Sequence, residues 1–144
     1  MRADTGIKAW TVTVSSDLAG LKRALSGLER WLARNGVQEE AEHRARLVLE
    51  EIVTNISRYG FDDRRTHEID IAGRMTNSEL TLTFDDTGRP FDPRTAAAPV
   101  PAANLAEAEI GGRGLLLVRT SARRMDYQRT ADDHNRLTVT LSRS

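Results

Sequence analysis

Apolar and polar residues alternate with a period of two in five segments of the chain, as they do in strands that bury one face. The apolar positions of these segments are Trp10, Val12 and Val14; Ile69 and Ile71; Leu80, Leu82 and Phe84; Met125 and Tyr127; and Leu137, Val139 and Leu141. Strands that are buried on both faces would be continuously apolar instead. We therefore predict a sheet that carries its helices on one side only.

Leucines recur at intervals of three and four residues after the first strand, which is typical of one face of a helix. They are Leu18, Leu21, Leu25, Leu28 and Leu32. Ser15 and Ser16 precede this stripe and Asn35-Gly36 follows it, so we expect the helix to begin and end there. Two heptads are too short for a leucine zipper, and we interpret the stripe as a core-facing side.

Two further helices and one long loop complete the predicted architecture. The second helix extends from about Gln38 to Tyr59, and the third begins near Gly114. The segment from Asp92 to Ile110 is rich in alanine and proline, and a loop of this length is usually a functional lid or a disordered segment. We expect a mobile lid at about residues 92–110 in a single domain that spans residues 1–144. The order of elements predicts an α+β fold, a two-layer sandwich.

The composition excludes several classes of function. The 144 residues suffice for about one domain, and 21 basic residues balance 21 acidic ones, which argues against direct binding to nucleic acid or a membrane surface. The chain has no cysteine, so disulfides, thiolate metal sites and a cysteine nucleophile are excluded. No apolar run reaches the roughly 18 residues of a membrane helix, and no secretory leader opens the chain. We expect a cytoplasmic protein.

The common phosphate-binding loop is also absent. A loop of that kind requires G-x-x-x-x-G-K-[ST], and the only lysines, Lys8 and Lys22, lie near no glycine-rich turn. The three histidines, His43, His67 and His134, do not have the spacing of metal ligands. Any phosphate chemistry must therefore use other residues.

Three local features could carry such chemistry. Glu51 and Asn55 lie a turn apart at the edge of the apolar face of the second helix, where a carboxylate is costly without a partner or a task. The segment from Phe84 to Pro93 lies at the end of a strand and contains Asp86, which could accept a hydrogen bond from an exocyclic amine, and Gly88, which would let the backbone approach a flat base. The turn Gly111-Gly112-Arg113-Gly114 precedes a helix and could bind an anion. Taken singly, each could also be an ordinary surface helix or turn.

Together and in this order, E-x-V-T-N, D-x-G-R-P-F-D-P and G-G-R-G-L resemble the three sequence boxes of the histidine-kinase-like ATPases. The likeness is greatest to the single-domain bacterial anti-sigma-factor serine kinases, and it runs from the first strand to the segment that ends in Leu141. It implies the Bergerat fold, in which a mixed, mostly antiparallel sheet carries helices on one face.

The resemblance also implies a role for each matching residue. Glu51 would be the general base, and Asn55 the side-chain ligand of Mg²⁺. The nucleotide-binding residues would be Asp86 on the adenine amine, Gly88 beside the base, Gly112 and Gly114 on the phosphates, and Thr138 near the adenine. Ile110 stands where a relative has a lid arginine, so Arg113 would supply the cation for the γ-phosphate.

The function implied is that of an ATP-dependent protein serine/threonine kinase with ATP and Mg²⁺. Its partners would be an anti-sigma-factor antagonist of the STAS type, which it phosphorylates, and a sigma factor, which it sequesters; family members are commonly homodimers. One alternative is an ATP-gated protein-binding switch without kinase activity, and another is a scaffold that has lost its nucleotide. The presence of both Glu51 and Asn55 favours the kinase.

Overall fold

The computed structural model describes residues 8–95 and 114–144, which form five strands and three helices. The elements are β1 (Lys8–Ser15), α1 (Leu18–Arg34), α2 (Glu39–Tyr59), β2 (Glu68–Met75), β3 (Glu79–Asp86), β4 (Arg124–Arg129) and β5 (Asn135–Ser142), with a further helix over residues 114–121 between β3 and β4. All five predicted strands and the second helix lie where the sequence pattern places them.

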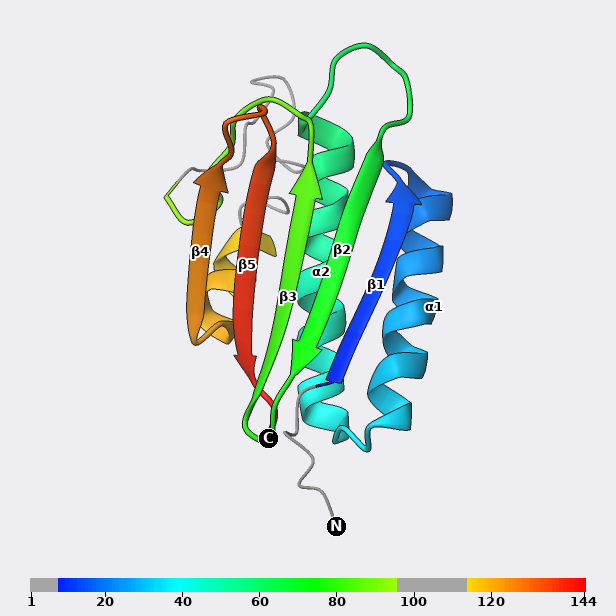
Figure 1. Ribbon diagram of the computed structural model, residues 1–144, viewed down its shortest axis with the longest axis vertical. Helices are drawn as coiled ribbons and strands as arrows, with labels where there is room; N and C mark the ends of the chain where they lie inside the picture. Colours follow the sequence, from blue (N-terminus) through cyan, green and yellow to red (C-terminus); the bar gives the residue numbers. More distant parts are fainter. Residues whose placement is uncertain (1–7, 96–113) are drawn as a thin grey trace.

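The strands form one sheet in the order β1-β2-β3-β5-β4. Its four pairings are all antiparallel, so the parallel pair that a mixed sheet would contain does not occur between described strands. Figure 1 shows α1, α2 and the helix over residues 114–121 together behind the sheet. The predicted two-layer α+β fold is therefore confirmed.

The core fills the space between the two layers. Alternate residues of β3 are buried, as its sequence pattern predicts, and Phe84 at 1% exposure is among the largest fully buried side chains. From the helical layer, Leu28 and Leu49 are fully buried against these strands. The opposite face of the sheet carries no described helix.

The predicted beginning and buried side of α1 need correction. The helix begins after Asp17, whose carboxylate accepts a hydrogen bond of 2.8 Å from the backbone N–H of Gly20, and Leu18 is 65% exposed. Leu28 and Leu32 are buried as expected, but they share that side with smaller residues and one tryptophan: Gly20, Ala24, Gly27 and Trp31. Leu21 and Leu25 also pack against the core, so the leucine stripe marks one part of the buried side, and the small side chains beside it let the helix approach the sheet closely.

Candidate functional site

A cavity of about 210 Å³ lies between α2 and the ends of β3 and β5. Its walls are mainly apolar, and they include Ile52, Ile56, Phe84, Leu115 and Leu137. Three buried polar residues, Asn55, Asp86 and Asn135, also line it. An apolar cavity with a few convergent polar groups is typical of a small-molecule site.

Asp86 is the last residue of β3 and is only 5% exposed. Its Oδ1 accepts hydrogen bonds from the backbone N–H of Gly88 (2.8 Å) and from Nδ2 of Asn135 (3.2 Å). Its Oδ2 makes no hydrogen bond to another described residue. Burial raises the pKa of the Asp86 carboxyl, and the bond from Gly88 acts against this shift. The arrangement leaves one carboxylate oxygen available to a donor in the cavity.

Gly88 lies behind Asp86 in the turn that follows β3. The next residue, Arg89, donates its backbone N–H to the carbonyl oxygen of Gly60 (2.9 Å), which fastens this turn to the end of α2. A β-carbon at position 88 would lie 2.8 Å from that same oxygen. A side chain there would therefore push the turn away from α2, which explains the glycine. Gly88 positions the carboxylate and does not itself line the cavity.

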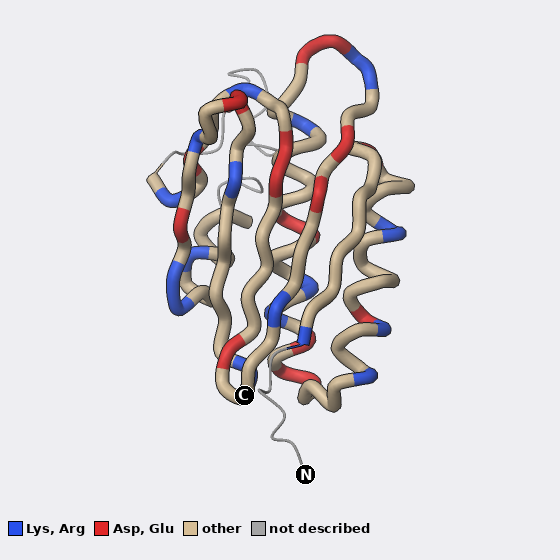
Figure 2. The backbone as a smooth tube through the Cα atoms, viewed as in Figure 1, with Lys and Arg blue, Asp and Glu red and all other residues tan. Residues whose placement is uncertain are grey.

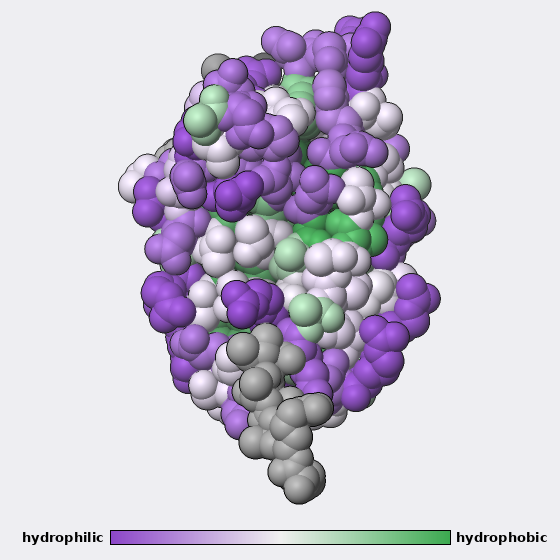
Figure 3. Space-filling view, in the orientation of Figure 1, coloured by the Kyte–Doolittle hydropathy of each residue, from purple (hydrophilic) through white to green (hydrophobic). Residues whose placement is uncertain are grey.

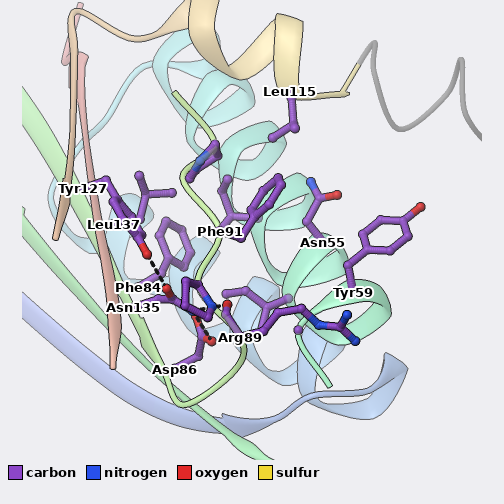
Figure 4. A pocket seen from close by; sticks show the side chains of 15 residues that line it. Asn55, Tyr59, Phe84, Asp86, Arg89, Phe91, Leu115, Tyr127, Asn135 and Leu137 are labelled. Atoms are coloured by element: carbon purple, nitrogen blue, oxygen red, sulfur yellow. Dashed lines mark hydrogen bonds between the residues drawn. The ribbon is translucent and has the colours of Figure 1, made fainter. Parts of the chain in front are cut away.

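Asn55 enters the cavity from α2 and is 8% exposed. Its Nδ2 donates to the backbone carbonyl of Glu51, one turn earlier, at 2.9 Å. Its Oδ1 has no hydrogen bond within the described part of the chain. Figure 4 shows Asn55 on one side of the cavity, near Leu115, and Asp86 on the other. An amide oxygen is thus available some way from the carboxylate.

Glu51 lies outside the cavity lining, beside the start of the helix over residues 114–121. It is half-buried, and burial raises the pKa of its carboxyl, with the negative charge of Glu50 adding to the shift and Arg58 opposing it. Gly114 lies so close that a β-carbon there would overlap the Glu51 carboxylate. The structure therefore brings Glu51, Asn55 and Gly114 together; Gly112, Arg113 and Ile110 lie outside the described residues.

Thr138 does not belong to this site. The strand β5 directs alternate residues to opposite faces, and Leu137 faces the cavity. Thr138 therefore faces the helix-free side, where its hydroxyl lies 3.4 Å from that of Thr83. Thr138 therefore does not lie where the resemblance implies, because β5 lines the cavity through Asn135 and Leu137.

Asn135, which was not among the predicted site residues, is 7% exposed at the start of β5. Its Nδ2 lies within hydrogen-bonding distance of Asp86 Oδ1, the Gly88 carbonyl (3.3 Å) and the Arg89 carbonyl (2.9 Å). A signal was present in the sequence. Asn135 precedes the apolar residues Leu137, Val139 and Leu141 in period two, and a polar residue on such a buried face needs an explanation.

These residues fit a purine nucleotide with Mg²⁺. The apolar walls suit a flat base, and the accessible Asp86 Oδ2 suits an exocyclic amine. Among residues 8–95 and 114–144, no group of three or more His, Asp or Glu side chains could hold a metal ion. A Mg²⁺ ion near Asn55 would therefore take most of its ligands from phosphate and water, as this ion often does.

Fold and site together define a two-layer α+β domain with a ligand pocket between its layers. The family model of the histidine kinase-like ATPase domain matches residues 14–141, and the chain belongs to this family. Membership in the family implies ATP binding. The match covers β2, β3 and β4 in full and β5 up to Leu141, but only the last two residues of β1.

One curated relative is the serine/threonine-protein kinase BtrW of Bordetella bronchiseptica. It is 30% identical over 139 residues, which are 96% of this chain and 93% of the relative. This similarity supports an ATP-using, kinase-like function and confirms the resemblance to the single-domain kinases.

Two solved structures share the fold. The RsbU and RsbW domains of a Mycobacterium tuberculosis protein match with a TM-score of 0.62 at 17% identity, over 95% of this chain but only 33% of that one. The SiaB-SiaC complex of Pseudomonas aeruginosa matches with a TM-score of 0.60 at 14% identity, over 96% of this chain and 91% of the other. In the described part of the present chain, no helix has the length and apolarity to cross a membrane.

Proposed function

We propose that this chain is a protein serine kinase that transfers the γ-phosphate of ATP to an anti-sigma-factor antagonist of the STAS type and sequesters a sigma factor. The observation that carries this proposal is the position of Glu51. Its half-buried carboxylate lies against Gly114 and one turn from Asn55, beside a cavity that ends at Asp86.

Each residue has a distinct task in the proposed reaction. Asp86 accepts a hydrogen bond from the adenine amine through Oδ2, while the apolar walls hold the ring. Asn55 is the side-chain ligand of Mg²⁺, which when bound neutralises phosphate charge. Backbone N–H groups near Gly114, and those of Gly112 with the side chain of Arg113, contact the phosphates.

Glu51 is the general base of the transfer. The serine Oγ attacks the γ-phosphorus, and a new P–O bond forms as the bond to the β,γ-bridging oxygen breaks and ADP leaves. The serine proton passes to the Glu51 carboxylate. Burial raises the pKa of the Glu51 carboxyl, which makes its carboxylate a stronger base than that of an exposed glutamate.

The partners of the proposed kinase follow from its relatives. BtrW is named a serine/threonine-protein kinase, and the two solved structures are of RsbU and RsbW domains and of a SiaB-SiaC complex. These similarities support a partner protein of the antagonist type as substrate, and the sigma factor as a second partner is part of the proposal itself. We further propose a homodimer, which light scattering of the purified protein would test.

The decisive assay combines the protein with γ-labelled ATP and a candidate STAS-type antagonist. We expect label on one serine of the antagonist, identified by mass spectrometry, and none with Asp86→Ala, which should lose ATP binding but keep its fold. If the wild-type protein binds an antagonist only in the presence of ATP and transfers no phosphate to it, the chain is an ATP-gated switch instead.

A further inference from the structure

The hairpin of β4 and β5 contacts the nucleotide cavity through side chains that the proposed mechanism does not use. Asn135 lies at the centre of these contacts. Its amide nitrogen faces three oxygen acceptors, on Asp86, Gly88 and Arg89, at 2.9–3.3 Å. One buried amide thus connects the carboxylate at the end of β3 to the turn that follows it.

Tyr127 on β4 holds Asn135 from the other end. Its hydroxyl donates to Asn135 Oδ1 at 2.5 Å, and Figure 4 shows the two side chains meeting at the edge of the cavity. Because the Oδ1 atom accepts this bond, the amide nitrogen is directed at Asp86. A flipped amide would place Oδ1 against three acceptors and lose the bond from Tyr127.

Arg129 reinforces the same turn from β4. Its guanidinium donates to the carbonyl oxygen of Gly88 at 2.7 Å, and its positive charge favours the ionised form of Asp86. The turn is therefore bound on one side to α2, through Gly60, and on the other to the hairpin. Tyr127 and Arg129 can hold this turn in place without contacting the reacting atoms.

We propose that Asn135, held by Tyr127, is a positioning residue that selects adenine by fixing the direction of the Asp86 carboxylate. With Oδ1 of Asp86 engaged by Gly88 and Asn135, Oδ2 has one orientation toward the base. It then accepts from an exocyclic amine and repels a carbonyl at the same position. This inference rests on the proposed recognition of adenine by Asp86.

The test measures the dissociation constants of ATP and inosine triphosphate, which has a carbonyl in place of the adenine amine. We expect the wild-type protein to prefer ATP by roughly tenfold or more, the worth of a hydrogen bond to a charged group. Asn135→Ala should reduce this preference about tenfold, and Tyr127→Phe should reduce it by several-fold. In a protein that already carries Asn135→Ala, Tyr127→Phe should not reduce the preference for ATP any further, because Tyr127 acts through Asn135.

The control is Gln128→Ala, an exposed position of β4 on the helix-free side, which should leave both constants unchanged. Thermal unfolding of each variant shows that it is folded. The inference would be overturned by a folded Asn135→Ala protein in which the ratio of the two dissociation constants is unchanged. Binding of both nucleotides weakened by the same factor would be such a result. If the wild-type protein has no preference for ATP, or Asp86→Ala retains it, the proposed adenine contact itself fails.

Discussion

At the scale of single residues, Glu51 and Asp86 are two carboxylates whose pKa values are raised by burial, yet their surroundings differ. Asp86 has hydrogen-bond donors from Gly88 and Asn135 that favour its ionised form. Glu51 has no such donor within the described part of the chain, and the charge of Glu50 adds to the shift. The first environment suits a fixed acceptor and the second suits a base that gains a proton during the reaction.

The raised pKa of Glu51 predicts the pH dependence of phosphate transfer. A base works only when it is ionised, so the rate should be full above the raised pKa and should fall as the pH drops through it. The fall should therefore begin at a higher pH than for an ordinary glutamate. Single-turnover rates measured from acidic to neutral pH, with saturating ATP, would show this. A rate that stays constant down to the usual glutamate range would contradict the assignment.

The predicted site residues that the structure places in or beside the cavity are those with a local signal in the sequence. Asp86 and Gly88 stand in a turn after a strand, and Glu51 and Asn55 share one side of a helix. Asn135 depends on contacts that span 46–49 residues of sequence, so no local pattern connects it to Asp86. Thr138 was misplaced because the face of a residue changes with a shift of one position along a strand.

At the scale of elements, the helix over residues 114–121 places its first residue against Glu51. Gly114→Ala should displace the Glu51 carboxylate, because the new methyl group would occupy its place. The carboxylate is the end of a flexible side chain, so the fold should persist while phosphate transfer falls by about 10²-fold, the effect of misplacing a catalytic group.

Thr120→Ala is the matched control for this prediction, since Thr120 is exposed in the same helix. Transfer rates and unfolding midpoints of both variants would be compared with the wild type. A Gly114→Ala protein with the wild-type rate would mean that Glu51 and Gly114 are not this close during the reaction.

An ion pair between His134, in the turn between β4 and β5, and Asp85 of β3 has a predictable effect on stability. His134 Nδ1 lies 2.5 Å from Asp85 Oδ1, and this hydrogen bond raises the pKa of His134, with Asp132 adding to the shift and Arg136 opposing it. The folded protein therefore holds the proton more tightly than the unfolded chain does. The resulting stabilisation is full below the unfolded-state pKa and is lost as the pH rises through the folded-state pKa.

This stabilisation can be measured by urea unfolding of the wild type and of His134→Asn across the histidine range of pH. The difference in unfolding free energy should be largest at the acidic end and shrink as the pH rises. His43→Asn, at an exposed position of α2, controls for the loss of an imidazole. A difference that is independent of pH, or that grows with pH, would contradict the role of this pair.

The elements themselves could be predicted well from the sequence, because each strand buries one face and so alternates. The error in α1 has a physical cause. Trp31 stacks on Trp10 of β1 with ring centroids 5.8 Å apart, and a β-carbon at Gly73 would lie only 2.6 Å from the Trp31 ring. This packing between distant segments directs the side of α1 with Gly27 and Trp31 toward the sheet. The spacing of the leucines gives no information about such contacts, so it could not predict this orientation.

At the scale of the whole molecule, the described helices all lie on one side of the sheet, and none of them covers the other side. Figure 3 shows that side of the sheet, with near-neutral and some hydrophobic residues in its centre and hydrophilic residues around them. Basic and acidic positions are mixed over it, and Figure 2 shows no continuous basic stripe on the described residues of this view. The cavity lies between the layers, so the proposed base on α2 and the proposed adenine-binding residue on β3 come from different elements.

The central claim is that Glu51 is the base of a phosphate transfer from ATP bound between these layers. Glu51→Gln keeps the size of the side chain but cannot accept a proton at neutral pH. Its single-turnover transfer to the antagonist and its affinity for Mg-ATP should be measured on the same preparation. Asn55→Ala serves for comparison, since loss of the Mg²⁺ ligand should weaken Mg-ATP binding itself.

We expect Glu51→Gln to bind Mg-ATP nearly as the wild type does, because a base contributes mainly in the transition state. Its transfer rate should fall by roughly 10²–10⁴-fold, the usual effect of removing a positioned general base. A Glu51→Gln protein that phosphorylates the antagonist at the wild-type rate would place the base elsewhere and contradict this account.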